Sequence, residues 1–258
     1  MKTALSLSTP EEWETAGRLR ADFREVRIDL IRDEDTALRL MKLCNEYAKS
    51  VKSAESSESA TATLTAMPNA SAATSDRDAC ADFDDTQPCE RIPTIATIRS
   101  RKEGGEFDGG IGDWHLAIKP WLSTACDYID VEEQFSPLAE EIHSYGKKII
   151  ASVHMNRMPG LSELSNIEKR LRSYGDIVKI VVAPGSMSDA ADFVKFTADA
   201  QKPIITSIMG SEFAKVRIAL MIAGSALIYC HAGRQASAGQ YHIADVQKII
   251  EILNPVNP

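Results

Sequence analysis

A single lysine interrupts an apolar run in this sequence of 258 residues. Lys179 lies within residues 177–182, whose other members are isoleucine and valine, a composition typical of a buried parallel strand. Burial lowers the pKa of an amine toward neutrality, and a neutral amine can form a Schiff base with a carbonyl. The alternative is a structural lysine, held in a salt bridge or reaching out to solvent.

A histidine ends the preceding apolar run, residues 148–154. The ordinary pKa of an imidazole is about 6.5, which suits His154 for proton transfer near neutral pH. A lone histidine at the end of a strand is often structural. The lysine on the next predicted strand favours the catalytic interpretation.

Three charged residues, Glu25, Arg27 and Asp29, alternate with apolar residues in the predicted strand 25–30. A period of two places their side chains on one face of the strand. If that face lines the interior, the charges need either protein partners such as Arg99 or a polar ligand. The sequence leaves both interpretations open.

Further polar residues follow predicted strands. Arg99 ends the third strand, and the glycines at 104–105 allow a tight turn that places Glu103 over the mouth of the fold. Arg217 follows the seventh strand and could bind a carboxylate through two hydrogen bonds. The small residues of 237–240 could form a lid after the eighth strand. Each of these segments also fits an ordinary surface loop or helix.

The elements that must position these residues are short apolar runs that alternate with amphipathic, helix-like segments. Eight such units predict a (β/α)8 barrel, in which catalytic groups lie at the C-terminal ends of the strands. An open doubly wound sheet is the alternative, because periodicity does not show closure. The predicted strands are 3–8, 25–30, 93–99, 128–132, 148–154, 177–183, 203–209 and 227–230.

One segment departs from this alternation. Half of the positions in 51–90 are alanine, serine or threonine, which cannot bury enough apolar surface to offset the entropy lost on ordering. We therefore expect a single barrel domain over 1–258, interrupted by a flexible insertion at about 51–91 between the second helix and the third strand. Such a loop lies on the N-terminal face, away from the catalytic face.

The composition excludes several function classes. A net charge of −8 argues against nucleic acid and anionic membranes as partners. No run of 18 apolar residues and no signal-like N-terminus is present, so we expect no membrane span and a cytoplasmic protein. No HExxH, GxGxxG, P-loop or GxSxG motif occurs. We therefore expect no metal, nucleotide or serine-hydrolase chemistry.

Taken in order, these segments resemble the type I 3-dehydroquinate dehydratase family. The resemblance covers nearly the whole chain except the insertion. Members of that family often follow the histidine with Asp-Phe, where this chain has Met155-Asn156, and often have a proline between Ala238 and Gly239. The matching segments are 25–29, 97–100, 102–106, 152–154, 178–180, the spacing from Met209 to Arg217, and 236–240.

The resemblance implies a barrel lyase that converts 3-dehydroquinate to 3-dehydroshikimate in the shikimate pathway, with no cofactor beyond a covalent imine. Lys179 would attack the ketone, His154 would move the proton, and Glu103 would orient His154. Arg217 would hold the substrate carboxylate. Members of the family are commonly dimers, so a homodimer is expected.

The resemblance also assigns the remaining pocket residues. Glu25, Arg27 and Arg99 would bind ring hydroxyls, and Ser237 and Gln240 would form the lid. The other members of the expected pocket are Ser6, Met209 and Tyr229.

Two rival functions remain. A class I aldolase also carries a Schiff-base lysine on the sixth strand of a barrel, and a barrel that has lost catalysis would bind without turnover. The Lys-Glu-Gly-Gly-Glu loop at 102–106, together with Ser-Ala-Gly-Gln at 237–240, favours the dehydratase.

Overall fold

The computed structural model describes residues 1–58 and 91–254, with side-chain surroundings for 1–48 and 91–254. The chain divides into two compact units, residues 1–45 with 92–258 and residues 46–91. The first unit contains every predicted site residue and is the one described below. The predicted insertion lies largely outside the described residues, although helix α2 (Glu34–Glu58) extends into its first part.

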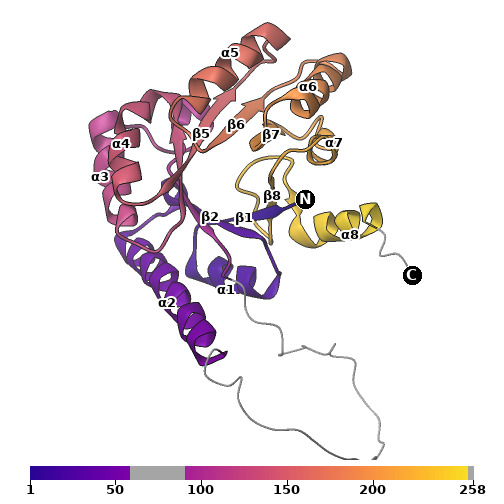
Figure 1. Ribbon diagram of the computed structural model, residues 1–258. Helices are drawn as coiled ribbons and strands as arrows, with labels where there is room; N and C mark the ends of the chain where they lie inside the picture. Colours follow the sequence, from indigo (N-terminus) through magenta and orange to yellow (C-terminus); the bar gives the residue numbers. More distant parts are fainter. Residues whose placement is uncertain (59–90, 255–258) are drawn as a thin grey trace, which may run out of the picture. The chain divides into compact units, whose positions relative to one another are not determined.

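Eight parallel strands follow one another in chain order and form the sheet of this unit (Figure 1). Neighbours pair from β1 through β7, and β1 also pairs with β8. A short strand, β9 (Tyr241–His242), pairs with β8. The strands are β1 (Thr3–Leu7), β2 (Phe23–Arg27), β3 (Thr94–Thr97), β4 (Tyr128–Glu132), β5 (Lys148–Met155), β6 (Ile177–Val182), β7 (Ile204–Ile208) and β8 (Ile228–His231).

Ser225 and Ala226, which precede β8, join the two ends of this sheet by hydrogen bonds to β7. The Ala226 amide donates to the Ile204 carbonyl at 2.7 Å. The Ser225 hydroxyl accepts from the Thr206 amide at 2.9 Å and lies 3.1 Å from the Leu227 carbonyl oxygen. These bonds satisfy backbone groups that an open sheet edge would leave unpaired. The fold is therefore the predicted α/β barrel and not the open sheet.

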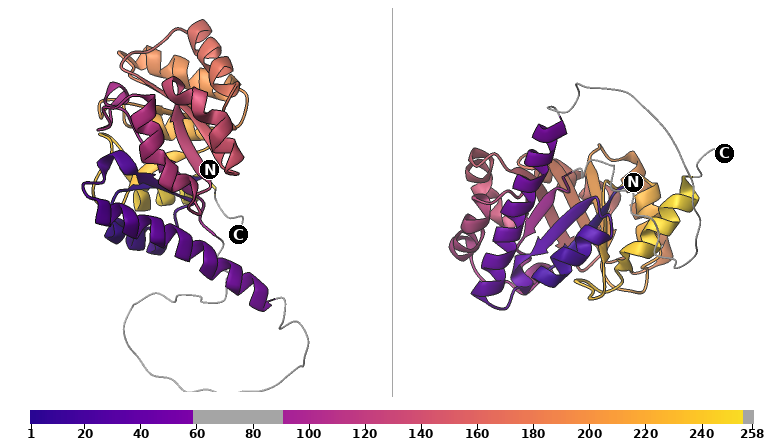
Figure 2. Two further views of the ribbon diagram at one scale, coloured as in Figure 1. Left: turned by 90° about the vertical axis from the view of Figure 1, so that its left-hand side faces the viewer. Right: turned by 90° about the horizontal axis from the view of Figure 1, so that it is seen from below.

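In the described part of the chain there are eight α-helices, and those that lie wholly in the first unit follow its strands and cover the outside of the barrel (Figure 2). The first begins at Pro10 behind Thr9, whose side chain accepts the Glu12 amide at 3.3 Å. None of the described helices combines the length and hydropathy that a membrane span requires. Besides α2, the helices are α1 (Pro10–Arg18), α3 (Ile111–Leu122), α4 (Ala139–Ser144), α5 (Leu161–Arg172), α6 (Met187–Asp199), α7 (Val216–Ile222) and α8 (Ile243–Leu253).

The second strand differs from its predicted bounds of 25–30. It ends at Arg27, and Ile28–Leu30 form a turn of 3-10 helix. The turn brings Asp29 onto Arg27, with Nε at 2.9 Å and Nη2 at 2.8 Å from its two carboxylate oxygens. The predicted strand position of Asp29 is therefore wrong, because the turn shortens the two-residue spacing of a strand enough for a two-pronged ion pair.

The interior of the barrel changes from apolar to polar along the strands. Closer to the N-terminal ends of the strands, inward side chains form one apolar cluster. Its buried members are Ala4, Phe23, Ile95, Ile150, Ile205, Leu227 and Tyr229. Two residues further along β1, β2 and β6, the corresponding positions hold Ser6, Glu25 and Lys179. Because alternate residues share a face, the polar layer lies toward the C-terminal ends of the strands, where barrel active sites lie.

Candidate active site

One pocket at the C-terminal ends of the strands brings the predicted site residues together. All of them except Ser6 line it, alongside Gly104, Val181, Ser207, Ile208 and Ala236. Strands β5 and β6 pair with Ser152 beside Lys179 and with His154 beside Val181. The candidate nucleophile and base therefore come from adjacent strands. His154 lies two residues beyond Ser152, the residue that is paired with Lys179.

Lys179 is buried and makes three contacts through its ammonium group. Nζ donates to Asp130 at 2.8 Å, lies 3.8 Å from a Glu25 oxygen, and stands 4.2 Å from the centre of the Tyr229 ring. The two carboxylates and the ring face stabilise the charged form against the desolvation that the sequence indicated. The salt bridge given as the structural alternative is therefore present, and nucleophilic attack requires this ammonium to lose a proton.

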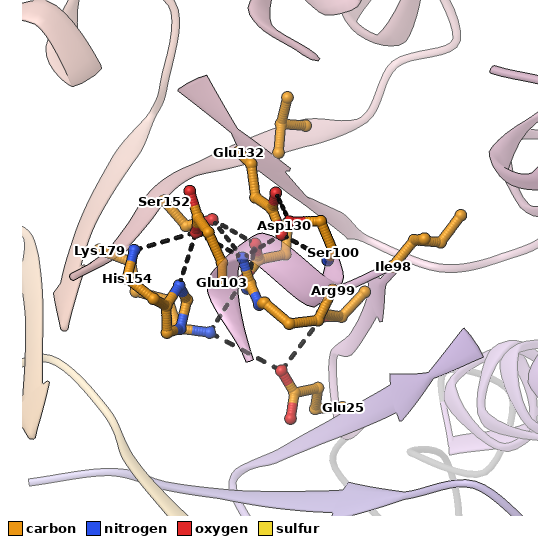
Figure 3. A network of polar contacts seen from close by, with 12 residues as sticks. Glu25, Ile98, Arg99, Ser100, Glu103, Asp130, Glu132, Ser152, His154 and Lys179 are labelled. Carbon is orange, nitrogen blue, oxygen red and sulfur yellow. Dashed lines mark hydrogen bonds and ion pairs between the residues drawn. The ribbon is translucent and has the colours of Figure 1, made fainter. Parts of the chain in front are cut away.

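Arg99 organises a buried network of carboxylates beside this lysine (Figure 3). Its guanidinium donates to Asp130 at 2.7 Å, to Glu132 at 2.9 Å and to Ser152 at 3.1 Å. Although burial opposes its charge, Asp130 and Glu132 raise the pKa of Arg99 above its usual range. Burial likewise opposes ionisation of Asp130, but Arg99 and Lys179 hold the pKa of Asp130 well below its usual range. The network therefore supplies fixed negative charge beside the amine.

Asp130 and Glu132 were not among the site residues predicted from the sequence. A signal existed, since both alternate with apolar residues in the predicted strand 128–132, in the same pattern as Glu25 and Arg27. Among the side chains that the structure describes, those of 1–48 and 91–254, no group of three or more metal-ligating residues could hold a metal ion.

Glu103 binds His154 twice through one oxygen. Its Oε2 accepts the His154 amide at 2.9 Å and lies 3.0 Å from Nδ1 of the ring. The predicted turn carries it there: Gly104 has φ +87°, and a Cβ on Gly105 would lie 2.1 Å from the Arg99 carbonyl oxygen. The turn therefore requires glycine at both positions.

The surroundings of this pair set its protonation. Burial and the charges of Arg99 and Lys179 hold the pKa of His154 well below its usual value, so the imidazole is neutral at neutral pH. Burial raises the pKa of Glu103 to about 8, with Arg99 opposing the shift. An ionised Glu103 accepts Nδ1–H and leaves a lone pair on Nε2, whereas a protonated Glu103 leaves the hydrogen on Nε2. Ionisation of Glu103 thus decides whether Nε2 can act as a base.

Arg217 is a buried cation whose hydrogen bonds go to carbonyl groups. Nη2 donates to the carbonyl oxygens of Ile208 at 2.7 Å and Ala238 at 2.9 Å. Nε is buried without a hydrogen-bond partner, and no carboxylate among the described residues forms an ion pair with this side chain. Burial lowers the pKa of Arg217 to about 10, which still leaves it charged at neutral pH. Such a site favours an anionic ligand.

Comparison with known proteins identifies the family. Residues 81–256, more than half of the chain, match the family model described as type I 3-dehydroquinase. The chain belongs to the type I 3-dehydroquinase family. A 3-dehydroquinate dehydratase from Methanoregula boonei is 42% identical over 164 residues, which cover 64% of this chain and 78% of that protein. One from Methanospirillum hungatei is 36% identical over 163 residues, 63% of each chain.

Solved structures agree on the fold. The 3-dehydroquinate dehydratase from Geobacillus kaustophilus superimposes with a TM-score of 0.72 at 20% identity, covering 98% of this chain and 91% of that one. The enzyme from Aquifex aeolicus has a TM-score of 0.67 at 21% identity, covering 99% and 100%. At these identities the similarity establishes the barrel alone.

In this type I 3-dehydroquinase, a chain of hydrogen bonds runs behind the pocket from β1 to the C-terminal loop. The Ser6 hydroxyl donates to Glu25 at 2.6 Å, and Gln240 Nε2 lies 3.4 Å from the Ser6 oxygen. Gln240 Oε1 accepts the amides of Ala236 and Ser237 at 3.0 and 3.3 Å. Gln240 is therefore buried and fixes the loop of residues 236–240, whereas Ser6 lies behind Glu25 and outside the pocket lining.

The Glu103–His154 pair of this type I 3-dehydroquinase predicts a pH dependence. If ionised Glu103 keeps Nε2 free, kcat/KM should increase as the pH rises through about 8, the raised pKa of Glu103. At lower pH, where Glu103 is protonated, kcat/KM should be smaller. Glu103→Gln should lose this rise, since a glutamine carbonyl accepts Nδ1–H at every pH. The measurement is kcat/KM from pH 6 to 10 for both proteins. A rise near pH 8 that survives in Glu103→Gln would assign it to another group.

Proposed function

We propose that this protein dehydrates 3-dehydroquinate to 3-dehydroshikimate through a Schiff base on Lys179. Its family and its relatives, which are named 3-dehydroquinate dehydratase, support the overall reaction. The observation that carries the mechanism is that the buried amine shares one pocket with the His154–Glu103 pair and with Arg217. An iminium supplies an electron sink and a histidine moves a proton, which are the two requirements of imine-assisted elimination.

In the first step, the nitrogen of Lys179 bonds to the ketone carbon. Two of the three ammonium protons leave with the ketone oxygen as water, and the third stays on the iminium. The nitrogen is therefore positively charged at the start of this step, as the ammonium, and at its end, as the iminium, and it is neutral in the attacking amine and in the carbinolamine between them. Asp130 at 2.8 Å and Glu25 at 3.8 Å stabilise the iminium in the same way as they stabilise the ammonium.

In the second step, Nε2 of His154 takes a proton from the carbon next to the iminium. The electron pair of that C–H bond moves toward the nitrogen, and its return expels the hydroxyl group on the next carbon. The hydroxyl takes the proton from His154 and leaves as water. One water then hydrolyses the imine, which releases the product and restores Lys179.

The other pocket residues bind the substrate. Arg217 holds the carboxylate, because its guanidinium is buried with Nε unpartnered and no carboxylate among the described residues forms an ion pair with it. Arg27 and Glu25 bind ring hydroxyls, and Ser237 closes over the ring on the loop fixed by Gln240. Met209 and Tyr229 form walls of the pocket.

Arg99 contributes differently from the role implied by family resemblance. Its terminal nitrogen atoms already bond Asp130, Glu132 and Ser152. We therefore propose that Arg99 mainly positions these groups and neutralises their charge, with any contact to a ring hydroxyl being secondary.

The two rival functions make different predictions for one experiment. Incubating the protein with 3-dehydroquinate, adding borohydride and mapping the adduct by peptide mass should give a modified Lys179 together with enone product. Product without an adduct would mean elimination without an imine. An adduct with an aldol substrate, and none with 3-dehydroquinate, would favour the aldolase. Binding of 3-dehydroquinate with neither adduct nor product would indicate a non-catalytic barrel.

The proposal includes a cytoplasmic homodimer, as the family resemblance implies. Light scattering of the purified protein during gel filtration measures the mass directly. One chain has a mass of 28.2 kDa, and we expect twice that mass. A single-chain mass would contradict the dimer.

Replacing Arg217 tests the carboxylate site. Arg217→Lys keeps the positive charge but loses the planar guanidinium that makes two hydrogen bonds. KM should therefore rise about 10- to 100-fold, which is the effect of losing one charge-assisted hydrogen bond. The change in kcat should be smaller. Arg170→Lys is a matched control, because its partner Glu133 lies on the exposed surface. An unchanged KM in Arg217→Lys would place the carboxylate elsewhere.

A further inference from the structure

The hydroxyl group of Tyr229 is a buried donor without a partner. Its oxygen has no hydrogen-bond partner among the described residues, although Tyr229 lines the pocket and is 8% exposed. A buried polar group in this state destabilises a protein unless a ligand satisfies it. Nε of Arg217 is in the same state in the same pocket. The parallel suggests that both atoms are left for the ligand.

The position of the ring determines which ligand atom the hydroxyl can reach. Nζ of Lys179 stands 4.2 Å from the centre of the Tyr229 ring. In the proposed reaction the ketone carbon bonds to this nitrogen, so the ketone oxygen becomes the ligand oxygen closest to Nζ, which itself lies over the Tyr229 ring. The carboxylate, in contrast, is held by Arg217. The ketone oxygen is also the atom that gains negative charge when the amine attacks.

We propose that the Tyr229 hydroxyl donates a hydrogen bond to the ketone oxygen of the substrate and to the carbinolamine hydroxyl that it becomes. Tyr229 would thus be a further catalytic residue, acting in the formation of the imine. This inference rests on the proposed Schiff-base reaction. The hydroxyl stabilises the oxygen while the Nζ–C bond forms and the carbonyl π bond breaks. The proton that the oxygen gains comes from the lysine nitrogen, so Tyr229 keeps its own.

The environment keeps this hydroxyl protonated. Burial, together with the nearby charges of Glu25 and Asp130, raises the pKa of Tyr229 well above its usual value. The phenol is therefore a neutral donor at neutral pH. The ring itself is packed in the apolar cluster at the base of the lumen, which fixes the direction of the hydroxyl.

Tyr229→Phe tests the proposal, because it removes the oxygen and keeps the ring under Lys179. We expect imine formation, measured by rapid mixing with 3-dehydroquinate and borohydride quench, to slow on the order of 10²-fold. We also expect the free protein to unfold at a higher temperature, because an unsatisfied buried group is gone. Slower imine formation together with a higher unfolding temperature would show a catalytic role, because loss of a purely structural group would lower the unfolding temperature.

Tyr174→Phe is the matched control. Its hydroxyl lies outside the pocket lining and has a partner, the Val131 carbonyl oxygen at 3.3 Å. This variant should form the imine at the wild-type rate and unfold at a lower temperature. Imine formation at the wild-type rate in Tyr229→Phe would overturn the proposal. No Lys179 adduct in the wild-type protein would instead overturn the proposed function itself.

Discussion

Lys179→Ala should abolish the borohydride-trapped adduct and lower kcat on the order of 10⁴-fold or more, as loss of a covalent nucleophile does in other enzymes. The substitution also removes the cation between Asp130 and Glu25. Breaking a buried ion pair typically costs about 3 kcal/mol. Arg99 still holds Asp130 at 2.7 Å, so the barrel should remain folded with a lowered melting temperature.

Lys179→Arg separates the two effects of that substitution. A guanidinium keeps the positive charge beside the carboxylates but cannot form an imine. This variant should therefore melt closer to the wild-type temperature than Lys179→Ala while being as inactive. Turnover in Lys179→Arg near the wild-type rate would exclude a Schiff base at this position. The measurements are steady-state kinetics, peptide mass after borohydride, and thermal unfolding followed by circular dichroism.

The sequence predicted the strands well where local and tertiary preferences agree. The fourth predicted strand has the observed bounds, 128–132, and the sixth differs by one residue. In both, β-branched residues favour a strand, alternating with acids in 128–132 and interrupted only by Lys179 in 177–182. The second strand was wrong beyond Arg27, because the Arg27–Asp29 ion pair favours a turn at residues that alternate like a strand. The closure through Ser225 also carries no periodic signal.

The site was predictable in its reacting groups and less so in their partners. Lys179 and His154 stand out because each is the polar exception in or at the end of an apolar run. Their partners do not stand out: Asp130 lies 49 positions from Lys179 in the sequence, on a strand that is not its neighbour in the sheet. Alternation shows which residues share a face, but only the strand order, with β5 paired to both β4 and β6, shows that Asp130 and Lys179 lie near each other.

The partners change the chemical description of the nucleophile. Considered alone, a lysine in an apolar strand is expected to be neutral through desolvation. In the structure, Asp130 and Glu25 favour the ammonium, and they also favour the iminium that replaces it. The nitrogen is thus positively charged in the resting ammonium and in the iminium, although it is neutral when it attacks the ketone. The fixed carboxylates stabilise the charge in both of these states.

Replacing His154 should separate the two halves of the reaction. His154→Gln keeps a polar side chain beside Glu103 but removes the base, so kcat should fall about 10³-fold, within the range for loss of general base catalysis. Lys179 and its carboxylates remain, so the imine should still form. At early times the trapped adduct should be heavier by one water than the adduct of the wild-type enzyme, because the elimination has not occurred.

The control for this variant is His143→Gln. His143 lies on the exposed surface, 3.2 Å from Asp176 and away from the pocket lining, and its loss should leave kcat unchanged. If His154→Gln instead gave the lighter, dehydrated adduct at the wild-type rate, another group would be taking the proton. Because the Nδ1–Glu103 contact is part of the same unit, combining His154→Gln with Glu103→Gln should lower kcat no further than His154→Gln alone.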